Sequence, residues 1–306
     1  DCADMIAFTG SVETGKRVMR RAAERLIPIS LELGGKDPMI VLKDADPDRP
    51  AGACVWGALM NSGQICTSIE RVYVEAPVYQ SFVDKVVARV RAIRQGASET
   101  EVDIGCMTSE EQFKTVASQV DEAVSRGARA LTGGRRRPDL PGYYYEPTVL
   151  VDVDHSMKVM TEETFGPIIP LVKVRDAEEA LRLANDSRYG LSGSIFSRDR
   201  ALAQRLAEEL QSGSVSINDS LVPFIVADAP MGGRKDSGFG YRHGAEGIRK
   251  FCQQKTVVSD KFGLKEEFPW YPATEKKTRQ IRHLLNLLCH SGWSHKIRAL
   301  KGLIGS

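Results

Sequence analysis

Short apolar runs alternate with amphipathic stretches along most of this sequence. The apolar runs have the length and composition of buried strands; they are Met5–Phe8, Ile29–Leu33, Pro38–Leu42, Arg71–Glu75, Pro167–Val174, Gly193–Phe196 and Gly213–Asn218. The stretches between them repeat apolar residues at helical spacing; they are Glu13–Arg25, Ala51–Met60, Tyr79–Arg94, Ser109–Arg126, Ala177–Asn185 and Asp199–Glu209. Strands that alternate with helices of this length predict an α/β fold with a largely parallel sheet.

Glycine and proline divide these predicted elements. Asp46-Pro47-Asp48 is typical of a helix start, because aspartate caps free N–H groups and proline fits the first turn. Gly133-Gly134 and Pro141-Gly142 bound a polar stretch that predicts a long surface loop. We find no internal repeat in the sequence, so the alternation predicts a globular α/β protein rather than a repeat array.

Composition and cysteine spacing narrow the class of protein. The chain has 306 residues, 42% of them hydrophobic and 27% charged, which is enough for two ordinary domains with a buried core. No apolar run approaches the roughly 18 residues of a membrane-spanning helix. The six cysteines are scattered without a C-x-x-C pair or zinc-ligand spacing. We therefore expect a reducing, cytoplasmic location and no metal site.

The charges are distributed unevenly along the chain. Residues 276–306 contain seven lysines and arginines and no aspartate or glutamate, whereas the preceding residues carry a net charge of −5. A mildly acidic body argues against nucleic-acid binding. The basic tail also carries leucines and a tryptophan, so it has the pattern of an amphipathic helix that binds a membrane surface. It would equally cover a neighbouring subunit or the mouth of a tunnel in the body, and the short apolar run favours packing against protein.

One constellation of residues could carry chemistry. Glu32 lies inside an apolar strand-like run, where a carboxylate is costly to bury without a partner or a task. Gly34-Gly35 follows it and permits a tight turn. Cys66 follows a glycine-glutamine turn, where a thiol can face a cleft. A thiolate attacks carbonyl carbon, and a nearby carboxylate can activate water to release the acyl group. Composition alone favours a simpler reading, in which Cys66 is a small buried residue and Glu32 a partnered strand end.

Six short motifs change that balance. In chain order they are Phe8-Thr9-Gly10-Ser11, Leu31–Lys36, Gly63-Gln64-Ile65-Cys66, Glu162–Pro167, Gly213–Asn218 and Met231–Gly238. Together they closely resemble the aldehyde dehydrogenase superfamily, as does the spacing between Glu32 and Cys66. The resemblance implies an aldehyde-dehydrogenase-like catalytic domain with a parallel-rich sheet, and a remnant of a Rossmann-type cofactor domain.

The resemblance also implies catalytic roles. Cys66 would be the nucleophile that forms a thiohemiacetal and then a thioester, and its backbone N–H would help to hold the oxyanion. Glu32 would be the general base that activates water for deacylation. A coenzyme-A-acylating relative usually lacks this glutamate, so its presence favours hydrolysis to a free acid. The substrate would be a small-molecule aldehyde.

The same resemblance implies a binding site for NAD or NADP. Gly10 and Ser11 would meet the pyrophosphate at a helix N-terminus. Glu163 would bind the nicotinamide-side ribose and Phe165 would pack near the nicotinamide. Asn218 would lie near the active site, although a turn residue at a strand end is a fair alternative for it. Outside the motif, Glu163 would be read as a helix-end carboxylate and Phe165 as a core aromatic.

Domain boundaries and assembly follow from the same comparison. We expect residues 1–34 to be the C-terminal part of the cofactor-binding domain, 35–234 the catalytic domain, 235–262 a return and oligomerisation segment, and 263–306 a basic amphipathic tail. Glu246–Ser259 resembles a terminal strand that extends a neighbour's sheet, which predicts a homo-oligomer, a dimer or tetramer.

The resemblance leaves alternatives open. Family chains carry a long stretch before the first motif, so we expect this chain to begin inside a domain. Two alternatives to an active dehydrogenase remain. The chain could be a non-catalytic or partner-requiring fragment of this fold, or it could be a cofactor-independent thiol esterase that uses Cys66 and Glu32. The stretch from Cys66 to Arg71 resembles members that oxidise succinate semialdehyde. We expect Arg71 to be a structural ion-pair residue rather than a substrate ligand.

Overall fold

The computed structural model describes residues 2–97, 101–261, 263, 265–267, 270–289 and 291–304. The chain divides into two compact units, residues 1–253 and residues 254–306. Asp1 and several residues of the expected tail, among them residues 305 and 306, lie outside the described residues. The two units are described separately below.

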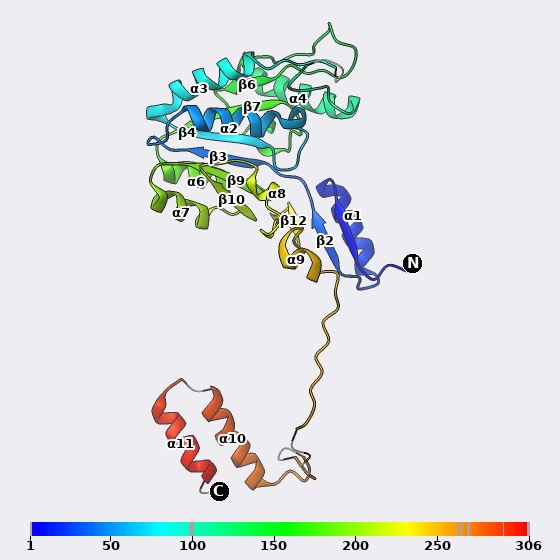
Figure 1. Ribbon diagram of the computed structural model, residues 1–306, viewed down its shortest axis with the longest axis vertical. Coiled ribbons are helices and arrows are strands. Elements are labelled where there is room, and N and C mark those ends of the chain that lie inside the picture. The colour runs from blue at the N-terminus through cyan, green and yellow to red at the C-terminus, as the bar shows by residue number, and fades with distance from the viewer. Residues whose placement is uncertain are drawn as a thin grey trace. The chain divides into compact units, whose positions relative to one another are not determined.

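A seven-stranded sheet forms the centre of the first unit, in the order β10-β9-β3-β4-β7-β6-β5 (Figure 1). Its strands are β3 (Asp37–Val41), β4 (Ile69–Glu75), β5 (Arg129–Thr132), β6 (Thr148–Val151), β7 (Ile168–Val174), β9 (Ser192–Phe196) and β10 (Ser214–Ile217). Neighbouring strands are parallel except for the β5–β6 pair at the edge. The prediction of an α/β fold with a largely parallel sheet is confirmed.

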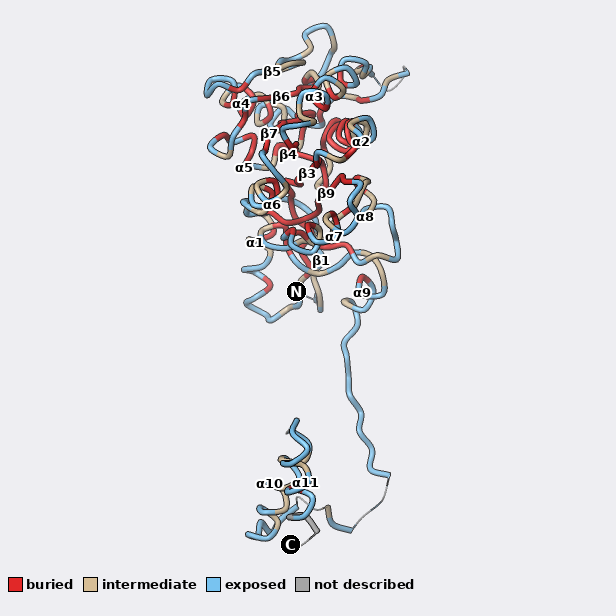
Figure 2. Tube along the Cα trace, turned by 90° about the vertical axis from the view of Figure 1, so that its left-hand side faces the viewer, coloured by how far each residue is buried: buried red, intermediate tan, exposed pale blue. Residues whose placement is uncertain are grey.

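Helices cover both faces of this sheet, as the period of two along each strand requires. Met39 and Val41 of β3 pack in a cluster with α2 (Asp48–Leu59) and α3 (Ala76–Arg91). Ile40, which points to the other face, packs in a cluster with α4 (Glu110–Ser125), α6 (Ala177–Asn185) and α7 (Arg200–Glu209). Strands buried on both faces explain why they read as continuous apolar runs in the sequence. Figure 2 shows the buried residues gathered on these strands.

A smaller sheet carries the start of the chain. β1 (Ile6–Thr9) runs parallel to β2 (Ile29–Glu32), and the late strand β12 (Gly238–Phe239) pairs antiparallel with β2. α1 (Val12–Ala23) connects β1 to β2, and its first turn is capped by the Ser11 hydroxyl, which accepts a hydrogen bond from the Thr14 N–H at 3.3 Å. Val12 of this helix packs with Leu31 and Leu33 in a small separate core. The chain then passes directly from β2 of the small sheet to β3 of the large one, so residues 33–36 lie at the crossing.

Minor elements complete the first unit. A two-stranded pair joins β8 (Tyr189–Gly190) to β11 (Arg234–Lys235). The short helices are α5 (Lys158–Thr161), α8 (Val222–Ile225) and α9 (Gly244–Arg249). α9 corrects one expectation, because it makes Glu246–Arg249 helical where the sequence predicted a strand. Residues 253–260 carry no assigned helix or strand and are exposed.

The second unit contains α10 (Glu275–Cys289) and α11 (Trp293–Ile304), which pack against each other as a helical hairpin. Ala299 of α11 is buried, whereas Leu288 and Trp293 are 69% and 81% exposed. Within the described residues, neither these helices nor any other is long and apolar enough to cross a bilayer.

Candidate active site

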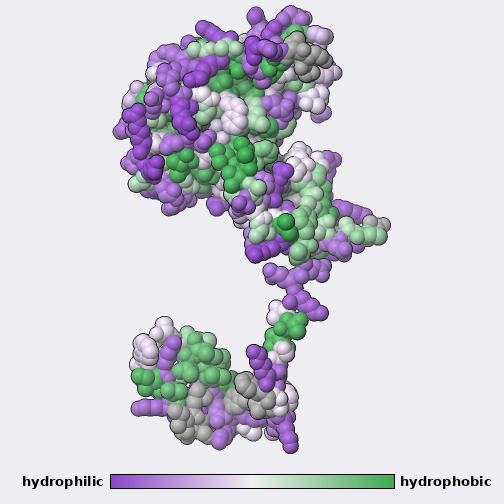
Figure 3. Space-filling model, viewed as in Figure 1, coloured by the Kyte–Doolittle hydropathy of each residue, from purple (hydrophilic) through white to green (hydrophobic). Residues whose placement is uncertain are grey.

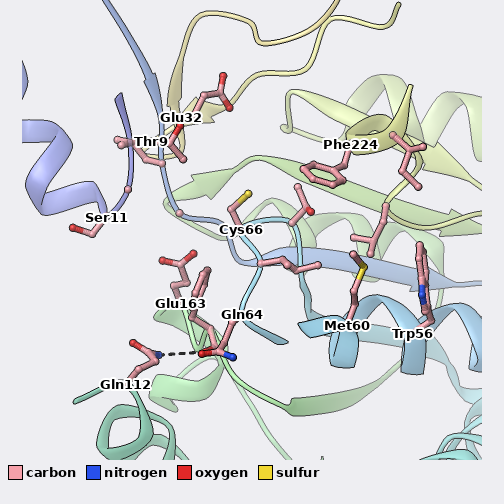
Figure 4. Close-up of a pocket in the computed structure, with 18 residues that line it drawn as sticks. Thr9, Ser11, Glu32, Trp56, Met60, Gln64, Cys66, Gln112, Glu163 and Phe224 are labelled. Atoms are coloured by element: carbon pink, nitrogen blue, oxygen red, sulfur yellow. Dashed lines mark hydrogen bonds between the residues drawn. The ribbon is translucent and has the colours of Figure 1, made fainter. Parts of the chain in front are cut away.

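A cavity of about 470 Å³ lies where the small sheet and the large sheet meet. Its lining includes the catalytic and cofactor-binding residues named from the sequence, which are Gly10, Ser11, Glu32, Cys66, Glu163 and Phe165. They come from the ends of β1 and β2, the segment after α2, and the segment before β7. Figure 4 shows Cys66 between Glu32 on one side and Glu163 on the other. The fold therefore brings together residues that are as much as 155 positions apart in the sequence.

The turn that carries Cys66 has an unusual backbone. Asn61, Ser62 and Gly63 follow one another with φ of 51°, 58° and 74°, although only the last is a glycine. Left-handed non-glycine residues cost about 1–3 kcal/mol each and cluster at functional sites. Hydrogen bonds hold the turn in place, from the Asn61 amide to the Gln64 carbonyl (3.1 Å) and from the Ser62 hydroxyl to the Gly105 carbonyl (2.9 Å). The half-buried Cys66 is thus held on a rigid segment.

The diglycine of the second motif, Gly34-Gly35, allows two close approaches. A Cβ on Gly35 would lie 2.4 Å from the Cys66 carbonyl oxygen, and one on Gly34 would lie 2.2 Å from a carboxylate oxygen of Glu163. A Cβ on Gly35 would meet backbone that cannot give way, so glycine is required there, whereas one on Gly34 would displace the end of the Glu163 side chain. The pair therefore lets the chain pass close to the Cys66 backbone and to Glu163.

Burial sets the electrostatics of Cys66. It raises the pKa of the Cys66 thiol to about 11, with a smaller effect of the same sign from the Asp37 carboxylate, while the Arg242 guanidinium lowers it. The thiol is therefore protonated near neutral pH in this arrangement. A nucleophilic role requires that its proton be removed as the reaction proceeds.

Glu32 has a carboxyl group suited to moving protons. The side chain is 7% exposed, and among the described residues its Oε1 atom is buried without a hydrogen-bond partner. Burial raises the pKa of Glu32 to about 7, while Arg242 and Lys250 lower it. A carboxyl group that titrates near neutral pH, on a residue that lines a cavity, can accept and return a proton.

Glu163 is held by the backbone at the crossing. Its Oε1 atom accepts a hydrogen bond from the Gly35 N–H at 3.0 Å. Burial raises the pKa of Glu163 to about 7, and repulsion from Glu70 adds to this. Ser11 and Glu163 also line a second cavity of about 490 Å³, together with Val12 and Glu13 of α1 and Arg188. The two cavities therefore adjoin at the N-terminus of α1.

A buried ion pair behind the cavity was missed by the sequence reasoning. Lys36 and Glu70 are fully buried and lie 2.7 Å apart, nitrogen to oxygen. The Glu70 carboxylate also accepts from the backbone N–H groups of Thr164 (2.7 Å) and Phe165 (2.8 Å). Glu70 thus fixes the segment that carries Glu163 and Phe165. The sequence did offer one sign of this pair: Lys36 and Glu70 each stand next to an apolar strand run, where a charged residue is expected to have a partner of opposite charge.

Two polar residues discussed from the sequence are bonded to backbone groups. Asn218 is not among the residues that line the main cavity; its side-chain oxygen accepts from the Ser197 N–H at 3.0 Å, and its side-chain nitrogen donates to the Ser197 carbonyl at 2.8 Å. Its φ of 57° matches the alternative of a turn residue at a strand end. Arg71 is buried and structural as expected, but its guanidinium donates to backbone carbonyls, among them those of Lys36 and Ala184, instead of to a carboxylate.

The opposite side of the cavity is apolar and was not identified from the sequence. It consists of Trp56 and Met60 at the end of α2, and Leu221, Phe224 and Ile225 around α8. Figure 4 shows Trp56, Met60 and Phe224 together on the far side of Cys66 from Ser11 and Thr9. These residues come from segments more than 160 positions apart, so no local pattern could have joined them.

Comparison with known proteins agrees with this geometry. Residues 2–257 match the family model described as the aldehyde dehydrogenase family. The chain belongs to the aldehyde dehydrogenase family. The resemblance inferred from the six motifs is therefore confirmed at the level of the family.

Individual relatives are similar over most of this chain. A protein of Mycobacterium ulcerans, named as a putative succinate-semialdehyde dehydrogenase using NADP(+), is 42% identical over 85% of this chain and 50% of its own length. The 4,4'-diapolycopene aldehyde oxidase of a Methylomonas species is 41% identical over 93% of this chain and 53% of its own length. The structure of Staphylococcus aureus betaine aldehyde dehydrogenase in complex with NAD+ is 39% identical, with a TM-score of 0.78 over 81% of this chain and 50% of that one. The chain spans about half the length of the curated relatives it matches.

Proposed function

We propose that this chain carries the catalytic centre of an NAD(P)-dependent aldehyde dehydrogenase that releases a carboxylic acid. The observation that carries the proposal is the cavity in which Cys66 lies between the carboxyl groups of Glu32 and Glu163. The Cys66 thiol loses its proton to solvent as its sulfur attacks the aldehyde carbon and forms the thiohemiacetal, and the Cys66 backbone N–H stabilises the oxyanion. The cofactor, when bound, supplies the hydride acceptor that turns this adduct into a thioester.

Glu32 has the properties of the base that completes the reaction. Its carboxyl group is buried, lacks a hydrogen-bond partner at Oε1, and has a pKa of about 7. It takes a proton from a water molecule that attacks the thioester carbon, and the carboxylic acid leaves as Cys66 regains its thiol. A carboxyl group with an ordinary pKa would be a weaker base, because basicity falls with pKa.

The residues present fit a nicotinamide cofactor. The free N–H groups at the N-terminus of α1 favour a pyrophosphate next to Gly10 and Ser11. The Glu163 carboxyl group can accept hydrogen bonds from ribose hydroxyls, and Phe165 supplies an aromatic ring to the lining of the same cavity. The similarity to a structure in complex with NAD+ supports the same assignment, and a relative is named for NADP(+). The cofactor is accordingly NAD or NADP.

The experiment follows reduced-nicotinamide formation by this chain with NAD+ or NADP+ and a panel of aldehydes. We expect turnover by the parent chain and by the Cys106→Ala variant, which removes an exposed cysteine outside the cavity. We expect Cys66→Ala to abolish turnover. Turnover that survives in Cys66→Ala would refute the nucleophile. If Cys66 can be alkylated but no combination of cofactor and aldehyde is turned over, the proposal is contradicted for this chain.

We also propose that the chain assembles as a homo-oligomer through residues 253–260. This segment is exposed and lacks helix or strand, and it presents Val257 and Val258 at 78% and 88% exposure. An extended segment with exposed valines suits addition to the sheet edge of a second copy. Sedimentation velocity should give a dimer or larger species for the parent chain. The Val258→Pro variant should shift it to monomer, because proline removes the donor that a strand pair needs.

A further inference from the structure

The apolar wall of the cavity points to a class of aldehyde. Resting on the function proposed above, we propose that the substrate is an uncharged aldehyde with a long aliphatic or aromatic apolar body. The apolar wall, defined as Trp56, Met60, Leu221, Phe224 and Ile225, would bind that body while Cys66 holds the aldehyde carbon.

On the α2 side of the apolar wall, a large apolar side chain is left partly exposed. Trp56 and Met60 are four residues apart, so they lie on the same face of the end of α2. Trp56 is 47% exposed, although its neighbours Val55 and Ala58 on the same helix are buried in the core. A large aromatic ring turned into a cavity is covered when an apolar ligand enters it.

The α8 side of the wall has the same character. Leu221 precedes α8 with φ of 60°, and the helix that follows is only four residues long. Phe224 and Ile225 project from it with 43% and 66% of their surfaces exposed. The end of α2 and the short helix α8 thus present exposed apolar side chains to one cavity, which argues for a shared apolar occupant.

The charges around the cavity argue against an anionic substrate. Among the described residues that line it, none is a lysine, arginine or histidine, and the two charged ones are the acids Glu32 and Glu163. The Arg242 guanidinium influences the pKa of both Glu32 and Cys66, but Arg242 is exposed and outside the lining. The carboxylate of succinate semialdehyde would therefore lose water here without gaining a partner.

Protection of Cys66 from alkylation tests the proposed class of substrate, an uncharged apolar aldehyde, without requiring turnover. The full chain is treated with iodoacetamide in the presence of butanal, hexanal, octanal, decanal or succinate semialdehyde, and labelling of Cys66 is followed by mass spectrometry. Reversible thiohemiacetal formation slows labelling. We expect the half-protecting concentration to fall by up to about fourfold for each methylene, the value of fully burying one such group. Succinate semialdehyde should protect worse than hexanal.

Two variants on separate elements keep the test decisive. Met60→Arg should weaken protection by decanal at least about tenfold and improve protection by succinate semialdehyde, because it places a cation in the apolar wall. Met19→Arg makes the same change on the exposed face of α1, outside the cavity. It should leave the half-protecting concentrations of decanal and of succinate semialdehyde unchanged. Phe224→Ser should weaken protection by decanal without improving protection by succinate semialdehyde.

The outcomes separate this inference from the function on which it rests. Protection by succinate semialdehyde equal to that by hexanal, or no dependence on chain length, overturns the apolar class while leaving the thiol chemistry intact. Absence of protection by every aldehyde, with Cys66 still labelled, overturns the proposed function and the inference with it.

The helical hairpin carries a second and independent inference. Ile281, Leu284, Leu285 and Leu288 recur at helical spacing on α10, and Trp293, Ile297 and Leu300 do so on α11. Between 39% and 81% of the surface of each of Leu284, Leu285, Leu288, Trp293, Ile297 and Leu300 is exposed. Figure 3 shows hydrophobic residues gathered over this unit near the connection of the two helices. Each helix has therefore an outward apolar face.

Basic side chains lie beside these faces. At 100° per residue, Lys296 and Lys301 flank the apolar face of α11, whereas Arg298 lies on the opposite side. From residue 276 to 306 the sequence has seven lysines and arginines and no acidic residue. We infer that the hairpin binds the surface of an anionic lipid bilayer, with its apolar residues at the acyl boundary and its lysines at the headgroups.

Vesicle co-sedimentation of the full chain tests this inference. We expect binding to phosphatidylcholine–phosphatidylserine vesicles, weak binding to phosphatidylcholine alone, and loss of binding at high salt. Lys296→Gln with Lys301→Gln should weaken binding about thirtyfold, and Leu285→Gln with Trp293→Gln should abolish it. Arg298→Gln is the matched control and should have the smallest effect. Failure of the parent chain to sediment with anionic vesicles, or equal binding by the apolar-face variant, overturns the inference.

Discussion

The main cavity has a polar wall, which carries Glu32, Cys66 and Glu163, and the apolar wall defined above. The two walls differ in how their side chains are held. On the polar wall, Glu163 accepts from the Gly35 N–H, and Glu70 behind it bonds Lys36, Thr164 and Phe165. On the apolar wall, Trp56, Phe224 and Ile225 project with large exposed surfaces. Directional hydrogen bonds fix geometry, whereas apolar contact is non-directional and adapts to its occupant. The difference suggests that Glu163 and the segment around it are preorganised, and that the body of the proposed substrate is bound adaptably.

The largest expected effect comes from removing the base on the polar wall. Glu32→Gln should slow release of the acid by about 10² to 10⁴, because general-base catalysis contributes that much. The acyl-enzyme should accumulate and be detectable by mass spectrometry, while iodoacetamide labelling of Cys66 stays within twofold of the parent, about the scatter of a neutral change. If Glu32→Gln released acid at the parent rate, Glu32 would not be the base.

The next effect comes from breaking the ion pair that supports the polar wall. Glu70→Gln leaves the fully buried Lys36 ammonium without its counter-charge and should lower the free energy of unfolding by about 3–5 kcal/mol. Denaturant unfolding measures it. Asp103→Asn is the control, since it breaks the exposed ion pair with Arg94, which solvent screens, and it should cost much less than Glu70→Gln. Equal losses in the two variants would contradict a structural role specific to Glu70.

The pH dependence distinguishes two groups on the same wall. Because burial raises the pKa of Glu32 to about 7, its basic form is lost as pH falls below 7, and acid release should fall with it. Because burial raises the pKa of the Cys66 thiol to about 11, its thiolate fraction should rise about tenfold per pH unit from pH 7 to 10. Acid release should therefore level off above pH 7 while iodoacetamide labelling keeps rising. A labelling plateau below pH 9 would refute the raised thiol pKa.

The smallest effect on stability is expected on the apolar wall. Ile225→Ser changes a side chain that is 66% exposed, so the free energy of unfolding should change by about 0.5 kcal/mol or less. Ile169→Ser, in the buried strand β7, is the contrast and should cost several times more, because it leaves a cavity and a buried hydroxyl in the core. Thermal unfolding of the two variants compares them. A large loss in Ile225→Ser would mean that the apolar wall supports the fold.

Most of the fold could be predicted from local patterns. Strands such as Ile29–Glu32 and Ile168–Val174 were read from apolar runs, and α6 matches its predicted bounds of Ala177–Asn185. The edge strand Arg129–Thr132 was missed, because it is short and partly exposed and has no apolar run. The strand predicted within Glu246–Ser259 was wrong at its start, where the chain forms α9 instead. Strand pairing at an edge depends on a partner that local sequence does not contain.

The candidate site divides in the same way. Cys66, Glu32 and Glu163 were named through the resemblance that the motifs carry, because the residue types alone favoured structural readings for them. Only the tertiary structure joined Trp56 to Phe224, paired Lys36 with Glu70, and turned Asn218 towards Ser197. Sequence thus determined the elements, which depend on neighbours a few residues apart, and it named the candidate reacting groups through motifs that are equally local. Burial, pKa and the apolar wall depend on segments that meet only after folding, and those the tertiary structure decided.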